Sequence, residues 1–313
     1  MAIPTISVVI PAYNAGKYIV SAVESVLTQD LIDYEIIVVD DGSTDNTLDQ
    51  LNSVDDPRLR VLTQKNAGVS SARNLGIANA VAKYIYFLDA DDLLRPQTFT
   101  RCVKAMTQNH NVSLVYGEAQ TFIDGQVPVL KQNQPIFAKR PSGDVSKEIV
   151  IANCIACGSA VMVRSFNIKS TGGFSSLLRL GEDWVMWVEL AALGEFVYLP
   201  APAICFYRQH QKSAARTLAV DVNEMTPAIN HIYQLPSVTN THPASFLHSA
   251  KKQATANALC YSAQEMLKQR QWRGARTLYF RAIKRRPFHL RTLILFCCAS
   301  LRFVPRFIGN KLK

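Results

Sequence analysis

The chain lacks any apolar run long enough to cross a membrane, and its start lacks the basic, apolar pattern of a secretory leader. The nearest candidate for a membrane span, residues 292–301 (TLILFCCASL), is short and lies between two arginines. Met1 and Ala2 lead directly into a strand-like segment, residues 6–10. These absences predict a cytoplasmic protein without a membrane-spanning segment.

Cysteine is scarce and unpatterned, with seven residues spread over 313. Cys154 and Cys157 form one CxxC motif, but no second pair accompanies it. A structural zinc site needs further ligands at set spacings, and neither a zinc site nor a redox centre is expected here. We expect thiols that pack in the core of a protein from a reducing compartment.

Acidic residues are almost absent from the last part of the chain. Residues 245–313 contain 15 of the 34 basic residues and one of the 24 acidic ones, Glu265. The remaining residues carry a small negative balance. Such a segment is typical of a patch that binds anionic lipid or nucleic acid, attached to a near-neutral domain.

Strand-like and helical patterns alternate over the first ninety residues. Apolar, β-branched runs at 6–11, 34–39, 59–64 and 83–88 are separated by helical patterns, among them 17–28 and 70–82. This alternation predicts an α/β fold with a mainly parallel sheet covered by helices on both faces. Ligands of such sheets bind beyond the carboxyl ends of the strands, so polar residues there should converge.

The strand at residues 83–88 ends in three carboxylates within four residues, Asp89, Asp91 and Asp92. Crowded like charges repel one another, and a divalent cation that carries phosphate oxygens would offset that repulsion. An acidic cap on a helix that starts near Leu93 is the structural alternative.

Four stretches occur in a fixed order along the chain: 7–14 (SVVIPAYN), 35–45 (EIIVVDDGSTD), 66–76 (NAGVSSARNLG) and 87–92 (FLDADD). Together they closely resemble the inverting glycosyltransferases of family 2, which have the GT-A fold and commonly build bacterial surface polysaccharides. Residues 172–174, 181–184 and 207–210 extend the resemblance, which covers roughly residues 5–210. It implies a Rossmann-like GT-A domain that uses a nucleoside-diphosphate sugar, with a UDP-sugar as the expected donor.

The resemblance assigns the nucleotide to the first strand ends. Pro11, Ala12 and Tyr13 would contact the base and ribose, with the Tyr13 ring as a stacking surface. Asp41 would read the uracil, while Asp40 supports the loop. Capping of the next helix by Asp41 or a neighbouring polar residue competes with this role. Tyr13 would otherwise be an ordinary surface aromatic.

The diphosphate and its metal are expected at the later acidic strand end. Asp89, Ala90 and Asp91 form the DxD pattern that binds the nucleotide sugar, and Arg73 lies on a helix from which it could reach the pyrophosphate. The implied cofactor is Mn²⁺ or Mg²⁺, with Asp91 or Asp92 as its direct ligand. His210 is a further metal candidate, with a solvated histidine as the alternative.

The resemblance places the catalytic base about ninety residues further along. Asp183 is the expected base for the acceptor hydroxyl, and Glu182 its neighbour or an acceptor contact. A pair of helix caps is the alternative. Displacement in line would invert the anomeric centre. Trp184 and Trp187 could form the floor of an acceptor site, although their spacing on an apolar helix predicts that one of them lies in the core.

The expected organisation is a GT-A domain at 1–215, a linker or mobile loop at 216–249, and a basic helical region at 250–313. The helical region would bind an anionic membrane surface, near a glycan or lipid-linked acceptor, or pack on the domain. Nucleic acid is not expected. The protein would then be peripheral on the inner face of the cell membrane.

Three other functions fit the sequence less well. An NAD-dependent oxidoreductase would carry GxGxxG after the first strand, where Pro11-Ala12-Tyr13 stands instead. A nucleotidyltransferase would carry a glycine-rich, basic phosphate loop. A non-catalytic nucleotide-sugar-binding or scaffold protein with a GT-A fold is the remaining alternative, and it would not need Asp183 together with the acidic strand end.

Overall fold

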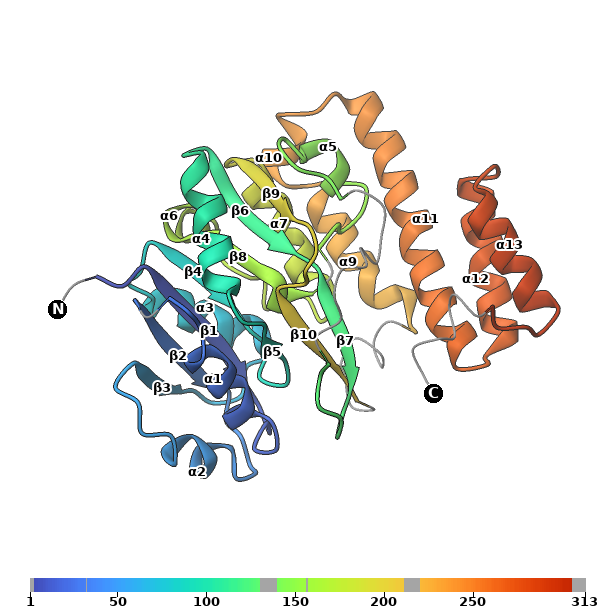
Figure 1. Ribbon diagram of the computed structural model, residues 1–313. Helices are drawn as coiled ribbons and strands as arrows, with labels where there is room; N and C mark the ends of the chain where they lie inside the picture. Colours follow the sequence, from blue (N-terminus) through green and yellow to red (C-terminus); the bar gives the residue numbers. More distant parts are fainter. Residues whose placement is uncertain (1–2, 32, 130–139, 156, 211–219, 306–313) are drawn as a thin grey trace. The chain divides into compact units, whose positions relative to one another are not determined.

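The computed structural model describes residues 3–31, 33–129, 140–155, 157–210 and 220–305 (Figure 1). The chain divides into two compact units. We call the first the α/β unit; it comprises Met1–Ile149, Asn153–Leu177 and Met186–His210. We call the second the helical unit; it comprises Val150–Ala152, Leu178–Val185 and Gln211–Lys313.

A seven-stranded sheet forms the centre of the α/β unit, in the order β3-β2-β1-β4-β8-β6-β9. Neighbouring strands are parallel except at β8, which runs antiparallel to both β4 and β6. The strands are β1 (Ile6–Ala12), β2 (Tyr34–Asp40), β3 (Leu59–Thr63), β4 (Tyr84–Phe87), β6 (Val112–Gly117), β8 (Val161–Arg164) and β9 (Glu195–Leu199). The expected mainly parallel α/β sheet is confirmed.

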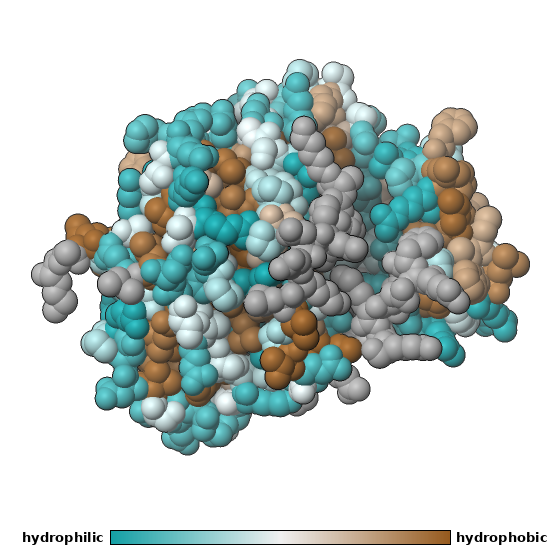
Figure 2. All heavy atoms as spheres, in the orientation of Figure 1, coloured by the Kyte–Doolittle hydropathy of each residue, from teal (hydrophilic) through white to brown (hydrophobic). Residues whose placement is uncertain are grey.

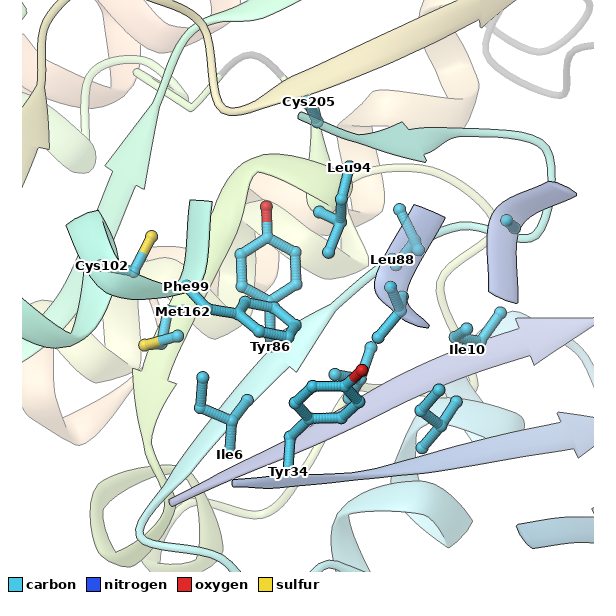
Figure 3. Packing of buried hydrophobic residues seen from close by; sticks show 14 of the residues in the cluster. Ile6, Ile10, Tyr34, Tyr86, Leu88, Leu94, Phe99, Cys102, Met162 and Cys205 are labelled. Atoms are coloured by element: carbon cyan, nitrogen blue, oxygen red, sulfur yellow. The ribbon is translucent and has the colours of Figure 1, made fainter. Parts of the chain in front are cut away.

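Helices cover both faces of this sheet (Figure 1). On one face, α1 (Ile19–Leu27) and α4 (Thr98–Gln108) pack on alternate residues of β1, such as Ile6 and Ile10, in one hydrophobic cluster (Figure 3). On the other face lies α3 (Val69–Asn79), whose Gly76 approaches Val9 of β1 closely. Burial on both faces explains why these strands are apolar throughout.

A second, three-stranded sheet in the order β5-β10-β7 lies beyond β4 in the chain. Its strands are β5 (Leu93–Leu94), β7 (Ala119–Ile123) and β10 (Cys205–Gln209). β10 pairs parallel with β7 and antiparallel with β5. Because β5 begins directly after Asp92, this small sheet brings residues 205–210 beside the acidic end of β4. Shorter helical elements complete the unit: α2 (Thr47–Asn52), α5 (Ser146–Ile149), η1 (Gly158–Ala160) and α6 (Ser165–Ser170).

The helical unit contains α9 (Val222–Ile232), α10 (Pro236–Thr239), α11 (Ala244–Lys268), α12 (Trp272–Arg285) and α13 (Leu290–Ser300). The last three helices share a small core that includes Leu259, Tyr279 and Leu295. The expected helical region after residue 250 is therefore observed, with residues 306–313 outside the described part. Helix α7 (Glu182–Ala191) begins in this unit and continues in the α/β unit.

The linker expected at 216–249 is corrected by the structure. Residues 211–219 lie outside the described part, but most of the stretch that follows is helical. Asp221 caps α9 by accepting from the Asn223 amide, and Ile229 and Ile232 are buried. Pro227 inside α9 interrupts the sequence pattern, which explains why this helix was not predicted.

Candidate functional site

The loops after β1 and β2 are tied together by Asn14. Its side-chain Oδ1 accepts a hydrogen bond from the backbone N–H of Thr44 at 2.8 Å, and its backbone N–H donates to Ser43 Oγ at 2.9 Å. Asn14 adopts a left-handed conformation with φ of 50°, which asparagine tolerates better than most residues. The preceding Tyr13 is 52% exposed. Pro11 and Ala12 are the last residues of β1 and are buried beneath this turn.

Asp41 is buried and organises the loop before α3. Its Oδ1 accepts from the Ala67 amide at 2.8 Å and from Gln64 Nε2 at 2.6 Å, and its Oδ2 accepts from the Gly68 amide at 2.8 Å. Gly68 has φ of 89°, a conformation that glycine adopts without strain. Asp41 therefore fixes the backbone of residues 67 and 68 and does not cap α2. That helix begins beside Asp45, whose Oδ1 accepts from the Thr47 amide at 3.0 Å.

Arg73 on α3 and Asp89 after β4 form an ion pair of 2.8 Å. The Arg73 guanidinium also lies over the ring of Phe174, 5.3 Å from its centroid. Its side chain is buried, whereas Asp89 is partly exposed. Arg73 is thus positioned at the acidic strand end, as expected, and it offsets the charge of Asp89 there.

The two remaining carboxylates of the acidic strand end have different surroundings. Asp92 is fully buried; Ser159 Oγ donates to its Oδ2 at 2.5 Å, and the Arg208 amide donates to its Oδ1 at 2.8 Å. Burial, together with the charges of Asp91 and Asp89, raises the pKa of Asp92 well above its usual range. Asp92 connects β4, η1 and β10, and its burial argues against a direct metal contact.

Asp91 is more accessible and faces His210. Asp91 Oδ2 and His210 Nε2 are 2.7 Å apart, and about a third of the Asp91 side chain is exposed. Burial first, and then the charge of Asp89, raises the pKa of Asp91, while the contact with His210 lowers it. The histidine ring stacks on Tyr18 with centroids 5.5 Å apart. Of the two aspartates, this geometry favours Asp91 as a metal ligand, with His210 beside it.

The donor chemistry of this pair fits a divalent metal. A carboxylate oxygen and an imidazole nitrogen suit Mn²⁺ better than Mg²⁺, because Mg²⁺ prefers oxygen ligands alone. No group of three or more His, Cys, Asp or Glu that could hold a metal occurs among the described residues. The protein would therefore supply two ligands, and the diphosphate and water would have to supply the others.

Several residues of this site carried no recognisable signal in the sequence. Arg208 donates from Nε to the Asp91 carbonyl at 2.7 Å, and its guanidinium lies over the rings of Tyr18 and Phe122. Asp124 binds Lys17 Nζ at 2.6 Å and the Tyr18 hydroxyl at 3.0 Å. Of these residues, only Arg208 lies in one of the short motif stretches that carry the family resemblance, 207–210. Ser159 and Asp124 could be found only from the structure.

Glu182 and Asp183 lie in the helical unit, in the first turn of α7. Both are half-buried. A negative charge is favourable at a helix N-terminus, so this position can hold an ionised carboxylate. Tyr261 of α11 is close enough to sense the charge of Asp183. Although 41% of Tyr261 is exposed, desolvation of its hydroxyl raises its pKa to about 12, and the charges of Glu265 and Asp183 add to the effect. Tyr261 also lines a pocket of about 200 Å³ between α11 and α13.

The two tryptophans of α7 are both buried, so neither forms the exposed floor of an acceptor site. Trp184 is 4% exposed and Trp187 is 1% exposed. The Trp187 ring contacts those of Phe87 and Phe174 within the α/β unit. The predicted core role is therefore the correct one for both.

The cysteines behave as packing residues. Cys102 and Cys205 are buried, and burial raises the pKa of Cys102 to about 12. Cys157 contacts Cys205, with their sulfurs 3.7 Å apart, rather than Cys154. Both cysteines of the CxxC motif are partly buried, and Cys157 packs against the core of the α/β unit.

The structure thus gathers ten of the predicted residues in the α/β unit, at the carboxyl ends of β1, β2 and β4 and their surroundings. These are Pro11, Ala12, Tyr13, Asp41, Arg73, Asp89, Ala90, Asp91, Asp92 and His210. Residues 7–168 match the family model described as "Glycosyl transferase family 2". The chain belongs to glycosyltransferase family 2.

Curated relatives of this glycosyltransferase include polysaccharide synthases. It is 33% identical over 212 residues to a chondroitin synthase of Pasteurella multocida (strain Pm70), covering 66% of this chain and 20% of that protein. It is 28% identical over 232 residues to the succinoglycan biosynthesis protein ExoO of Rhizobium meliloti (strain 1021), covering 70% of this chain and 65% of that protein. The matched region is thus only a fifth of the synthase.

Solved structures of similar fold are GT-A glycosyltransferases. The S. aureus TarS 1–349 complex with UDP-GlcNAc matches with a TM-score of 0.57 at 17% identity, covering 96% of this chain and 93% of that one. The mannosyltransferase PcManGT from Pyrobaculum calidifontis, in complex with GDP-Man and Mn²⁺, matches with a TM-score of 0.60 at 17% identity, covering 100% and 89%. The GT-A fold expected from the sequence is confirmed.

Proposed function

We propose that this glycosyltransferase moves a hexose from a UDP-sugar to an acceptor hydroxyl, with inversion at the anomeric carbon and with the help of Mn²⁺. The observation that carries the proposal is the Asp91–His210 pair at 2.7 Å, at the strand edge that also holds Tyr13 and Asp41. The TarS structure with UDP-GlcNAc and the PcManGT structure with Mn²⁺ support the choice of donor and metal.

In this proposal the nucleoside lies on the first two strand ends. The exposed Tyr13 ring offers a stacking face for the base, held in place by the turn that Asn14 fixes. Each carboxylate oxygen can accept two hydrogen bonds, and Asp41 Oδ2 has one partner among the described residues, the Gly68 amide. A base N–H can supply the second.

The diphosphate lies at the end of β4. Asp91 and His210 would hold the metal, which, when bound, would offset the charge that develops on the leaving diphosphate. Arg73 and Asp89 neutralise each other, so this ion pair can orient the ribose or the metal's water without adding net charge. Asp92 stays in the interior and fixes the geometry of the strand end.

Asp183 acts as the general base in this proposal. It would accept the proton of the acceptor hydroxyl as that oxygen attacks the anomeric carbon, while the bond from that carbon to the diphosphate breaks. Glu182 would contact the acceptor. An α-linked donor would give a β-glycoside. The acceptor belongs to glycan or lipid-linked oligosaccharide synthesis, an assignment supported by the similarity to a chondroitin synthase and to a succinoglycan biosynthesis protein.

The first test measures binding of UDP and GDP by calorimetry, with Mn²⁺, with Mg²⁺ and with chelator, followed by a donor screen under the best conditions. UDP binding that depends on Mn²⁺ and falls in Asp91→Asn is expected. Equal binding with chelator would overturn the metal assignment, and preferred binding of GDP would overturn the choice of donor.

The second test concerns the base. Asp183→Asn should abolish transfer and leave Mn²⁺-dependent UDP binding intact, because the amide cannot take the acceptor proton. Asp49→Asn is the matched control, since Asp49 also lies in the first turn of a helix, α2, and is exposed. Full transfer activity in Asp183→Asn would exclude Asp183 as the base.

A further inference from the structure

Helix α13 of the helical unit presents an apolar stripe to solvent. Leu290, Ile294 and Leu301 recur at helical spacing and are 69%, 45% and 79% exposed. The opposite side of the helix carries Leu295 and Ala299 in the shared core. The exposed stripe is therefore additional to what the fold of the unit needs.

Exposed aromatic residues also lie directly before and after this helix. Phe288 before α13 is almost fully exposed, and Phe303 after it is more than half exposed. We call Phe288, Leu290, Ile294, Leu301 and Phe303 the α13 stripe. Figure 2 shows hydrophobic residues gathered over α13. Exposed apolar patches of this kind mark interaction sites more often than single surface residues do.

Exposed basic residues lie on α12, on α13 and directly after α13. Arg281, Lys284, Arg291 and Arg302 are all exposed, and the Lys284 ammonium lies over the Phe280 ring, 4.7 Å from its centroid. None of these four cations takes part in an ion pair among the described residues. No acidic residue follows Glu265 in the sequence.

The charge pattern indicates which kind of partner would cover the α13 stripe. A second copy of the chain would bring the same uncompensated cations against these four, and like charges repel. A nucleic acid would neutralise the cations but would leave the apolar side chains in water. An anionic bilayer suits both the apolar side chains and the cations, because its acyl chains bury the apolar side chains and its headgroups pair with the cations.

We propose that the α13 stripe inserts shallowly into an anionic membrane surface and holds the enzyme there as a peripheral protein. The inference goes beyond the proposed reaction and does not depend on it. No helix among the described residues is both long and apolar enough to span a bilayer. Attachment by this stripe would hold the enzyme at the surface of an anionic bilayer.

The experiment measures sedimentation of the full chain with vesicles of phosphatidylcholine, alone or mixed with phosphatidylglycerol. We expect at least about tenfold stronger binding to the mixed vesicles, weakened by added salt. The variant Leu290→Glu/Leu301→Glu should lose binding by about tenfold or more. Phe166→Glu is the matched control, because Phe166 lies on α6 of the α/β unit and is equally exposed; it should bind like the wild type.

A second variant, Lys284→Gln/Arg291→Gln, separates charge from apolar contact. It should lose most of the preference for anionic vesicles, by about tenfold, while its circular dichroism spectrum stays unchanged. UDP binding should be retained in all these variants, which distinguishes failure of this inference from failure of the proposed reaction. No binding to mixed vesicles, equal binding to neutral ones, or a dimer in light scattering that Leu290→Glu/Leu301→Glu dissolves would overturn the inference.

Discussion

The strand ends of the α/β unit and the surface of α12 and α13 in the helical unit carry charge in different ways. In the α/β unit, charged groups at the strand ends have partners close by: Arg73 binds Asp89, and Asp92 accepts from Ser159 and the Arg208 amide. In the helical unit, Lys284 and Arg291 lie exposed without ion pairs among the described residues. A closed network fixes the geometry of a site, whereas unpaired surface cations remain available to an external anion.

The units also pack differently around glycine. A Cβ on Gly76 of α3 would lie 2.3 Å from Val9 Cγ1, a branched side chain on the central strand. A Cβ on Gly274 of α12 would lie 2.6 Å from Met266 Sδ, near the flexible end of a partly buried side chain. The contact at Gly76 can therefore adapt less than the contact at Gly274, because methionine repacks more easily than valine.

The largest expected effect comes from substitution of Asp91, the accessible carboxylate after β4. Asp91→Asn keeps the shape of the side chain but removes the charge that would hold the metal, so transfer from a UDP-sugar should fall about 100-fold or more. The midpoint of thermal unfolding should hardly change. Initial rates with Mn²⁺ and a melting curve test both parts. A wild-type rate in Asp91→Asn would contradict the assignment.

Substitution of Asp92, the buried carboxylate next to Asp91, should mainly lower the free energy of unfolding. Asp92→Ala leaves the Ser159 hydroxyl and the Arg208 amide without their acceptor, so the free energy of unfolding should fall by about 2–4 kcal/mol. Asp92→Asn, which keeps one acceptor oxygen, should lose less. Urea unfolding of both variants gives the comparison. Unchanged stability in Asp92→Ala would show that this residue does not connect β4 with β10.

The packing difference is tested by two glycine substitutions. Gly76→Ala should lower the free energy of unfolding by about 1–3 kcal/mol, because α3 must move away from Val9. Gly274→Ala should change it by less than about 1 kcal/mol and can raise it, because alanine favours the helix and Met266 can move aside. Equal losses in thermal unfolding would refute the contrast in rigidity.

The smallest effect concerns Asp124. The hydrogen bond from Lys17, helped by that from Tyr18, holds the pKa of Asp124 below its usual range although partial burial opposes the shift. Because the folded-state pKa is the lower one, this contribution to stability is present above the unfolded-state pKa and is lost as the pH falls through the folded-state pKa. Asp124→Asn should therefore be less stable than wild type at neutral pH and equally stable in strong acid, as urea unfolding at both pH values can show.

Much of the α/β unit followed from local patterns. Apolar strands between helical segments predicted the parallel sheet, and the residues 84–92 predicted a strand with an acidic end. The antiparallel insertion of β8 between β4 and β6 was not predictable, because the strands it joins are distant in the chain. Helix α9 was missed because Pro227 masks its period.

By itself, the sequence determined the family, through motifs in a fixed order, and the parallel strands and the set of carboxylates, which each consist of residues close together in the chain. Only the tertiary structure distinguished Asp91 from Asp92, because their surroundings come from Ser159, Arg208 and His210. Likewise, the composition shows that the C-terminal helical region is basic, but only the folded chain shows which apolar residues of α13 remain outside the core. Burial and partner choice are properties of the packed chain, and adjacent residues of the same type can acquire opposite roles through them.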